Sequence, residues 1–177
     1  MNYSPHKYRI PPLRPIYIGI DPAFRKSGFG MCVIDEANTV SFRTFRSFLD
    51  FLHWIFSEDA PEKAVVCVEN SNLDKIMYAY HRNKTGQAMA TAARNVGANQ
   101  AASQYTADAC RWKWPETTFD ISPRQKGSKW TKEQFYAVAR QEGHEVGKCS
   151  QDEMDAYKLA LRGKSLYFRS SLKRNQI

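Results

Sequence analysis

Three short apolar segments of strand length open the regular part of the chain. They span residues 16–20 (IYIGI), 27–35 (SGFGMCVID) and 39–45 (TVSFRTF). Their β-branched and aromatic residues favour strands, and the third segment alternates apolar with polar positions. Because the connections between them are short, we expect the three strands to pair antiparallel, as a hairpin or meander.

The apolar pattern changes to a helical period at residue 47. Apolar residues recur at helical spacing over 47–59, with Ser47 as a candidate N-cap and Pro61 just beyond the end. Farther along, the same criteria predict strands at 64–70 and 117–122 and helices at 87–110, 130–143 and 150–163. A run of strands followed by alternating helices and strands predicts an α/β fold, with a mixed five-stranded sheet and helices on both faces.

Cap residues indicate where the last two predicted helices begin and end. Thr131 and Ser150 are placed to cap the first turns, and Gly143 and Gly163 to end the helices. The chain is then divided into an extended, basic, proline-rich arm, one domain and a basic tail, over residues 1–15, 16–165 and 166–177.

Charge narrows the class of partner. The 177 residues are enough for one domain with a substantial core. Lys and Arg number 26 against 18 Asp and Glu, which gives a formal net charge of +8. This excess favours a polyanionic partner, most often nucleic acid, or an anionic membrane surface.

The cysteines and the apolar runs bear on location. Four widely spaced cysteines form no C-x-x-C pair, which argues against structural zinc. No segment approaches the length of a membrane span, and the first fifteen residues contain no apolar leader core. We therefore expect a cytoplasmic protein with free thiols that is neither secreted nor bound in a membrane.

Four acids stand at the ends and beginnings of the predicted elements. Asp21 and Glu69 follow the first and fourth strands, while Asp152 and Asp155 lie three residues apart on one face of the last helix. Each alone has a structural explanation, because acids favour helix N-termini and begin turns. Gathered at one sheet edge, however, they would repel one another unless a cation lay between them. Hard carboxylate oxygens select Mg²⁺ or Mn²⁺, and a pair of such ions can promote phosphodiester hydrolysis.

Five segments together are typical of one known family. They are, in order, IGIDPAFRKSGFGMCVID, VVCVEN, NVGANQAA, ISPRQKGSKWTKEQF and QDEMDAYKLAL. Over roughly residues 16 to 162 their order and spacing resemble the RuvC-like Holliday junction resolvases. The resemblance implies an RNase H-like nuclease domain whose site holds two Mg²⁺ ions, with Mn²⁺ able to substitute. Its metal ligands, which are also its catalytic acids, would be Asp21, Glu69, Asp152 and Asp155.

The sequence departs from the family pattern at three places. Ala23 replaces the usual glycine after Asp-Pro. The loop between Lys126 and Lys132 is shorter and lacks a Gly-rich stretch, which resembles the phage-type members. At the position of the family's junction-opening aromatic the chain has Asn72 or Leu73. Leu73 is therefore one candidate for opening the junction.

The resemblance also assigns roles to basic residues near the acids. It places Lys126 and Lys132 at two phosphate-contacting lysines, and we take Lys132 as the catalytic one, able to stabilise charge on the transferring phosphoryl group. A solvated basic face is the plainer explanation for any one of these residues. The expected DNA-binding residues are Arg25, Lys26, Arg82, Lys84, Arg124, Lys126 and Lys129.

Aromatic residues offer further candidates for contacts with bases. Tyr78 and Tyr80 lie among basic residues and are explained equally well as packing residues or as side chains that open a junction by stacking. Trp112 and Trp114, on either side of Lys113, are explained at least as well by packing as by base stacking.

These observations predict a Mg²⁺-dependent, structure-selective endonuclease. The resemblance implies a homodimer that resolves four-way DNA junctions in recombination and repair, each site nicking one strand. From the sequence, the Ala-rich helix from Ala88 to Ala109 is a candidate interface. One alternative is a less selective, phage-type nuclease for branched DNA. Another is a catalytically silent junction-binding module, against which the presence of all four acids argues.

Overall fold

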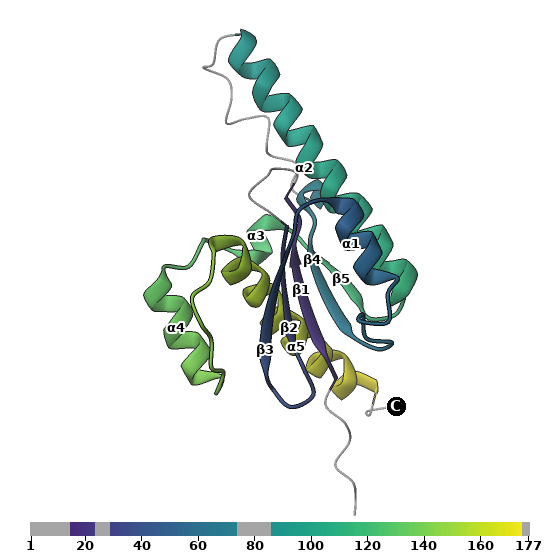
Figure 1. Ribbon diagram of the computed structural model, residues 1–177, viewed down its shortest axis with the longest axis vertical. Coiled ribbons are helices and arrows are strands. Elements are labelled where there is room, and N and C mark those ends of the chain that lie inside the picture. The colour runs from purple at the N-terminus through teal and green to yellow at the C-terminus, as the bar shows by residue number, and fades with distance from the viewer. Residues whose placement is uncertain (1–14, 24–28, 74–85, 175–177) are drawn as a thin grey trace, which may run out of the picture.

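A computed structural model describes residues 15–23, 29–73 and 86–174 of the chain, with side chains described as far as residue 170 (Figure 1). Its strands are β1 (Tyr17–Asp21), β2 (Phe29–Ile34), β3 (Val40–Phe45), β4 (Val65–Glu69) and β5 (Thr118–Ile121). Its helices are α1 (Phe48–Ile55), α2 (Gly86–Lys113), α3 (Pro123–Lys126), α4 (Lys132–Gln141) and α5 (Gln151–Arg174), with a 3₁₀ turn, η1, at Ser71–Leu73.

The strands form one mixed sheet in the order β3-β2-β1-β4-β5. β1 pairs antiparallel with β2, and β2 with β3, whereas β4 runs parallel to β1 and β5 parallel to β4. This confirms the predicted fold class, including the antiparallel arrangement of the first three strands. β1 and β4 are neighbours in register, so the acids that end them lie side by side at one edge of the sheet.

Helices cover both faces of the sheet (Figure 1). Ile18 and Ile20 of β1 pack in one core with α1 and α2, whereas Tyr17 packs in a second core with α5. Successive side chains of a strand point to opposite faces, so Asp21 faces the α5 side, as Tyr17 does. The same alternation in β4 places Glu69 on the α5 side.

Glycines let α5 lie directly on the sheet. A Cβ atom at Gly19 of β1 would overlap the backbone oxygen of Ala156 and the backbone nitrogen of Ala160. A Cβ atom at Gly30 of β2 would likewise collide with the backbone of Asp152. The first turns of α5, which carry the predicted acids, are therefore held close to the ends of β1 and β2 by the absence of side chains.

Several predicted boundaries are confirmed and one is wrong. Ser47 and Thr131 accept hydrogen bonds from the first turns of α1 and α4, and Gly143, at φ 74°, lies just beyond α4. Gly163, however, does not end α5, which continues to Arg174 and takes in much of the expected basic tail. A Cβ atom there would lie 3.4 Å from the sulfur of Cys67, so this glycine serves packing against β4.

Two expectations about the environment concern the cysteines and membranes. All four cysteines are free, and three of them, Cys32, Cys67 and Cys110, are buried in the core. Within the described ranges, none of the helices combines the length and apolar character needed to cross a bilayer.

Candidate carboxylate site

Three of the four predicted acids meet at one edge of the sheet. Asp21 and Glu69 end the parallel neighbours β1 and β4, and both face α5. Asp155, in the second turn of α5, is 2% exposed and lies against the same edge. The strands and α5 thus hold three carboxylates on rigid elements, as a preorganised site requires.

Lys126 lies between these three carboxylates. Its Nζ atom is 3.3 Å from each carboxylate oxygen of Asp21 and 3.4 Å from Oδ2 of Asp155, and it also contacts Glu69. The lysine side chain is only 10% exposed. One ammonium group therefore neutralises part of the charge of three largely buried acids.

Asp152 lies beside this cluster on a more open part of the surface. It shares the first turn of α5 with Glu153, but Glu153 is occupied in a capping box with Ser150, in which each side chain accepts from the other residue's backbone N–H. The cap leaves Asp152 and Asp155 free of that role. Gln151 donates a hydrogen bond of 3.1 Å to Oδ1 of Asp155 and helps orient it.

The electrostatics of the cluster follow from burial and like charges. Burial raises the pKa of Asp21 to about 7, with Glu69 and Asp155 adding to the rise and Lys126 opposing it. Burial also raises the pKa of Asp152, and Lys129 and Lys126 oppose this rise. Burial alone would lower the pKa of Lys126, but the surrounding carboxylates outweigh it and raise that pKa above its ordinary value. The lysine therefore stays charged.

The donor set fits a hard divalent cation. Carboxylate oxygens are the ligands that Mg²⁺ and Mn²⁺ prefer, and Oε2 of Glu69 is buried, with Lys126 as its described ion-pair partner. In the described parts of the chain, no three His, Cys, Asp or Glu side chains are already arranged to hold a metal ion. The chemistry of the site thus suits Mg²⁺, while its centre is held by a lysine.

The remaining predicted site residues fall into three groups. Lys132, expected to be catalytic, begins α4 with an exposed side chain, and none of its described contacts reaches the four acids. Lys129 is exposed and close enough to lower the pKa of Asp152, and Arg124 is exposed on α3. Leu73 is 49% exposed at the end of η1, near Glu69 in the chain. The residues Arg25, Lys26, Tyr78, Tyr80, Arg82 and Lys84 lie outside the described residues.

The sequence reasoning missed the element that brings Lys126 to the acids. α3 is a single short turn in which Ser122 and Gln125 form a capping box and Pro123 follows the cap. A Ser-x-x-Gln pattern with proline at the first helical position is a recognised helix start, so the signal was present in ISPRQK. Four residues are too few to show a helical period of apolar positions, so the hydrophobic pattern does not predict α3.

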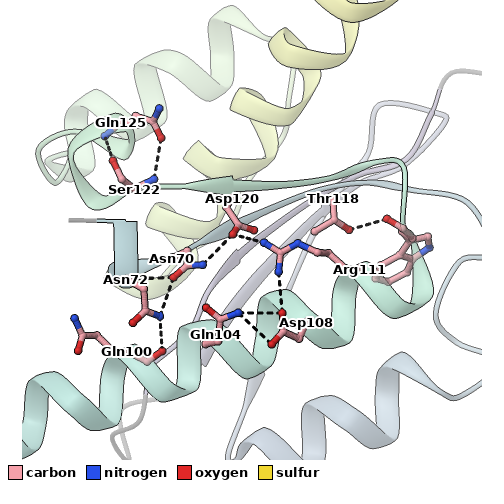
Figure 2. A network of polar contacts seen from close by, with 11 residues as sticks. Asn70, Asn72, Gln100, Gln104, Asp108, Arg111, Thr118, Asp120, Ser122 and Gln125 are labelled. Carbon is pink, nitrogen blue, oxygen red and sulfur yellow. Dashed lines mark hydrogen bonds and ion pairs between the residues drawn. The ribbon is translucent and has the colours of Figure 1, made fainter. Parts of the chain in front are cut away.

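A polar network supports the end of β4 from the other side. Asn70, which is 2% exposed, donates to Asp120 of β5 and accepts from the backbone and side chain of Asn72 (Figure 2). Asp120 is also paired with Arg111 of α2, and Asn72 donates to the backbone oxygen of Gln100. The turn directly after Glu69 is therefore tied to both β5 and α2.

Removing the centre of this network is expected to destabilise the protein. Asn70→Ala leaves the backbone N–H of Asn72 without its acceptor and removes one of the two donors to Asp120, so we expect the free energy of unfolding to fall by about 1–3 kcal/mol. Gln104→Ala, which removes exposed hydrogen bonds to Asp108 in the same network, should change it by no more than about 0.5 kcal/mol. Urea unfolding of both variants measures the difference, and equal losses would contradict the role given to Asn70.

Comparison with known proteins gives structural matches alone. No protein-family model and no curated protein matches the sequence. The structure of Thermus thermophilus RuvC in complex with Holliday junction substrate matches with a TM-score of 0.51 and 17% identity, over 88% of this chain and 96% of that chain. A second Thermus thermophilus RuvC structure matches with the same identity and coverage and a TM-score of 0.49. This chain therefore has a RuvC-like, RNase H-like fold.

Proposed function

We propose that this protein is a Mg²⁺-dependent endodeoxyribonuclease that resolves four-way DNA junctions by nicking phosphodiester bonds. The observation that carries the proposal is that Asp21, Glu69 and Asp155 meet around the ammonium group of a lysine, with Asp152 beside them. Bringing buried carboxylates together costs free energy, and such clusters are typical of functional sites. The RuvC-like fold supports the proposal, since the matched RuvC structure contains a Holliday junction substrate.

The four acids would bind metal, and a neighbouring lysine would contact the phosphate. Asp21, Glu69, Asp152 and Asp155 would hold Mg²⁺, which when bound lowers the pKa of water and neutralises charge on the leaving oxygen. Asp21 and Glu69 orient that centre from the sheet, and Asp155 and Asp152 orient it from α5. Lys126, one of the two lysines that the resemblance places at phosphate contacts, would stabilise charge on the phosphoryl group from its position among the acids, which is the catalytic role expected of Lys132.

Positive charge around the site supports a DNA substrate. The net charge of +8 favours a polyanion, and Lys129 and Arg124 are exposed on the segment that carries Lys126. Contacts of this kind position the backbone but carry little sequence information. Leu73 remains the candidate for opening the junction among the described residues, because it is half-exposed beside the strand end of Glu69.

An apolar face on α1 and α2 supports a homodimer. Leu49 of α1 and Phe56, the residue that caps the end of α1, are seven residues apart, and Tyr105 and Trp112 are spaced likewise on α2. Each is more than half exposed, and Phe56 and Trp112 contact each other at a ring distance of 4.9 Å. Four such side chains offer roughly 400–600 Å² of the ~800 Å² per partner that a stable dimer buries. We propose a second copy of this chain as the occupant of the face.

A charge placed on this face is expected to separate the dimer. Trp112→Lys should weaken self-association by at least roughly tenfold, because a lysine would be desolvated where an aromatic ring packs. Sedimentation equilibrium measures the dissociation constant. Phe168→Lys, at an exposed aromatic of α5 on the opposite face of the sheet, is the matched control and should leave it unchanged. A Trp112→Lys protein that dimerises as tightly as the wild type would assign the interface elsewhere.

Substrate preference distinguishes this proposal from its alternatives. The purified protein is incubated in Mg²⁺ with a mobile four-way junction, a Y-fork and linear duplex DNA. Symmetric nicking of the junction alone supports a resolvase, whereas cutting of every branched substrate supports the less selective, phage-type nuclease. Tight junction binding without cuts would support a silent binding module. The feature that resembles the phage-type members is the shortness of the segment between α3 and α4.

A further inference from the structure

The centre of the carboxylate site is held by a side chain of the protein, the ammonium group of Lys126. Nζ of Lys126 lies 3.3 Å from Asp21 and 3.4 Å from Asp155 and contacts Glu69, so it binds the oxygens that a divalent ion would need. Two cations at such separation in a buried site repel each other strongly. An ion that binds these three carboxylates together must therefore displace the ammonium group.

The charge balance shows which cation the site favours. Three carboxyl groups face a single ammonium group, and the burial of the site leaves this mismatch poorly screened by solvent. A divalent ion supplies twice the charge of the lysine. Without either cation, the three acids would repel one another, and α5 and the strand ends would be pushed apart.

The backbone around Lys126 is fixed, so its side chain can move out of the carboxylate site and back. It is the last residue of α3, whose first turn is fixed by the Ser122–Gln125 capping box. Gly127 follows at φ 80°, a conformation that favours glycine, so the backbone turns away at this point. The four-carbon lysine stem can then rotate outward while the backbone stays in place.

We propose that Lys126 is an internal counter-ion, which holds the carboxylates together before metal binds and is displaced by the incoming divalent cation. The inference rests on the proposed metal-dependent function of the same site. The released ammonium group is then positioned to meet a DNA phosphate, so the occupancy of the site by metal and the availability of this lysine are coupled.

Metal binding to the DNA-free protein tests the proposal. Titration calorimetry with Mn²⁺ should give Lys126→Gln an affinity at least about fivefold higher than that of the wild type, because the competing charge is gone. In metal-free buffer the same variant should melt at a lower temperature than the wild type, and Mn²⁺ should restore more of its stability. Lys63→Gln is the matched control, since Lys63 is exposed and precedes β4 at the far end of the sheet from Glu69. Its affinity should equal that of the wild type.

A second measurement uses the wild-type protein and does not depend on the variant folding. Lys126 should react slowly with an amine-acylating reagent in metal-free buffer, because its side chain is 10% exposed and paired, and faster once Mn²⁺ is added. Mass spectrometry of the peptide containing residue 126 reports the change. Equal or weaker Mn²⁺ affinity in Lys126→Gln, or acylation that Mn²⁺ does not accelerate, would overturn the inference. Neither readout involves DNA cleavage, so a protein that binds metal in this way but leaves junctions intact would contradict the proposed function alone.

Discussion

Asp155→Asn is expected to reduce junction nicking by roughly 10²- to 10³-fold, in line with the loss of one well-placed electrostatic group. Asparagine keeps the shape of the side chain and can still accept the hydrogen bond that Gln151 donates to Oδ1. The substitution removes one negative charge from a buried cluster, so the fold should be retained. Single-turnover nicking of a labelled junction in saturating Mg²⁺ measures the loss.

A neighbouring acid of α5 provides the control. Glu153 caps the start of α5 with Ser150 and contacts Thr44, and so is not directed at Lys126. Glu153→Gln should nick at close to the wild-type rate. If Asp155→Asn and Asp21→Asn both cut at full rate, the carboxylate cluster is not the catalytic centre.

Gly19→Ala is expected to have the largest effect on stability. The added methyl group would overlap the backbone of Ala156 and Ala160, and backbone atoms of a helix cannot move aside as a flexible side chain can. Overpacking of this kind costs about 1–3 kcal/mol and sometimes more, so we expect the free energy of unfolding to fall by about 3 kcal/mol. Urea unfolding followed by circular dichroism measures the change.

The control for this substitution has the opposite expected sign. Gly97 lies within α2, and a Cβ atom there would meet nothing within 4 Å. Gly97→Ala should therefore stabilise the protein by about 0.5–1 kcal/mol, because alanine loses less backbone entropy in a helix. A Gly19→Ala protein as stable as the wild type would mean that α5 does not pack on β1 as closely as described.

The positions of the sheet acids could be predicted because they depend on strand ends alone. Apolar runs locate β1 and β4, and parallel neighbours bring Asp21 and Glu69 to one edge. The spacing of Asp152 and Asp155 likewise places them together on a helix. Local pattern and chain order located these residues along the chain, whereas their closeness in space was implied by the family resemblance; their roles as metal ligands stay predictions.

Features that depend on how one element packs against another in the folded protein could not be predicted in the same way. Gly163 has the composition signal of a helix end, yet it allows α5 to pass over Cys67 and continue. Lys126 and Lys132 look alike in sequence, and their difference comes from α3, a four-residue helix that turns one of them toward the acids. A one-dimensional pattern cannot rank two lysines six positions apart, because tertiary packing decides which is buried.

Nick mapping on a four-way junction tests the central claim most directly. The wild-type protein is incubated with an end-labelled junction in Mg²⁺ and in EDTA, and the products are resolved at single-nucleotide length and treated with DNA ligase. We predict paired nicks at symmetric positions in Mg²⁺ that ligase can seal, as 5′-phosphate ends allow, and no nicks in EDTA. A junction that stays intact in Mg²⁺, or nicks that persist unchanged in EDTA, would contradict the account.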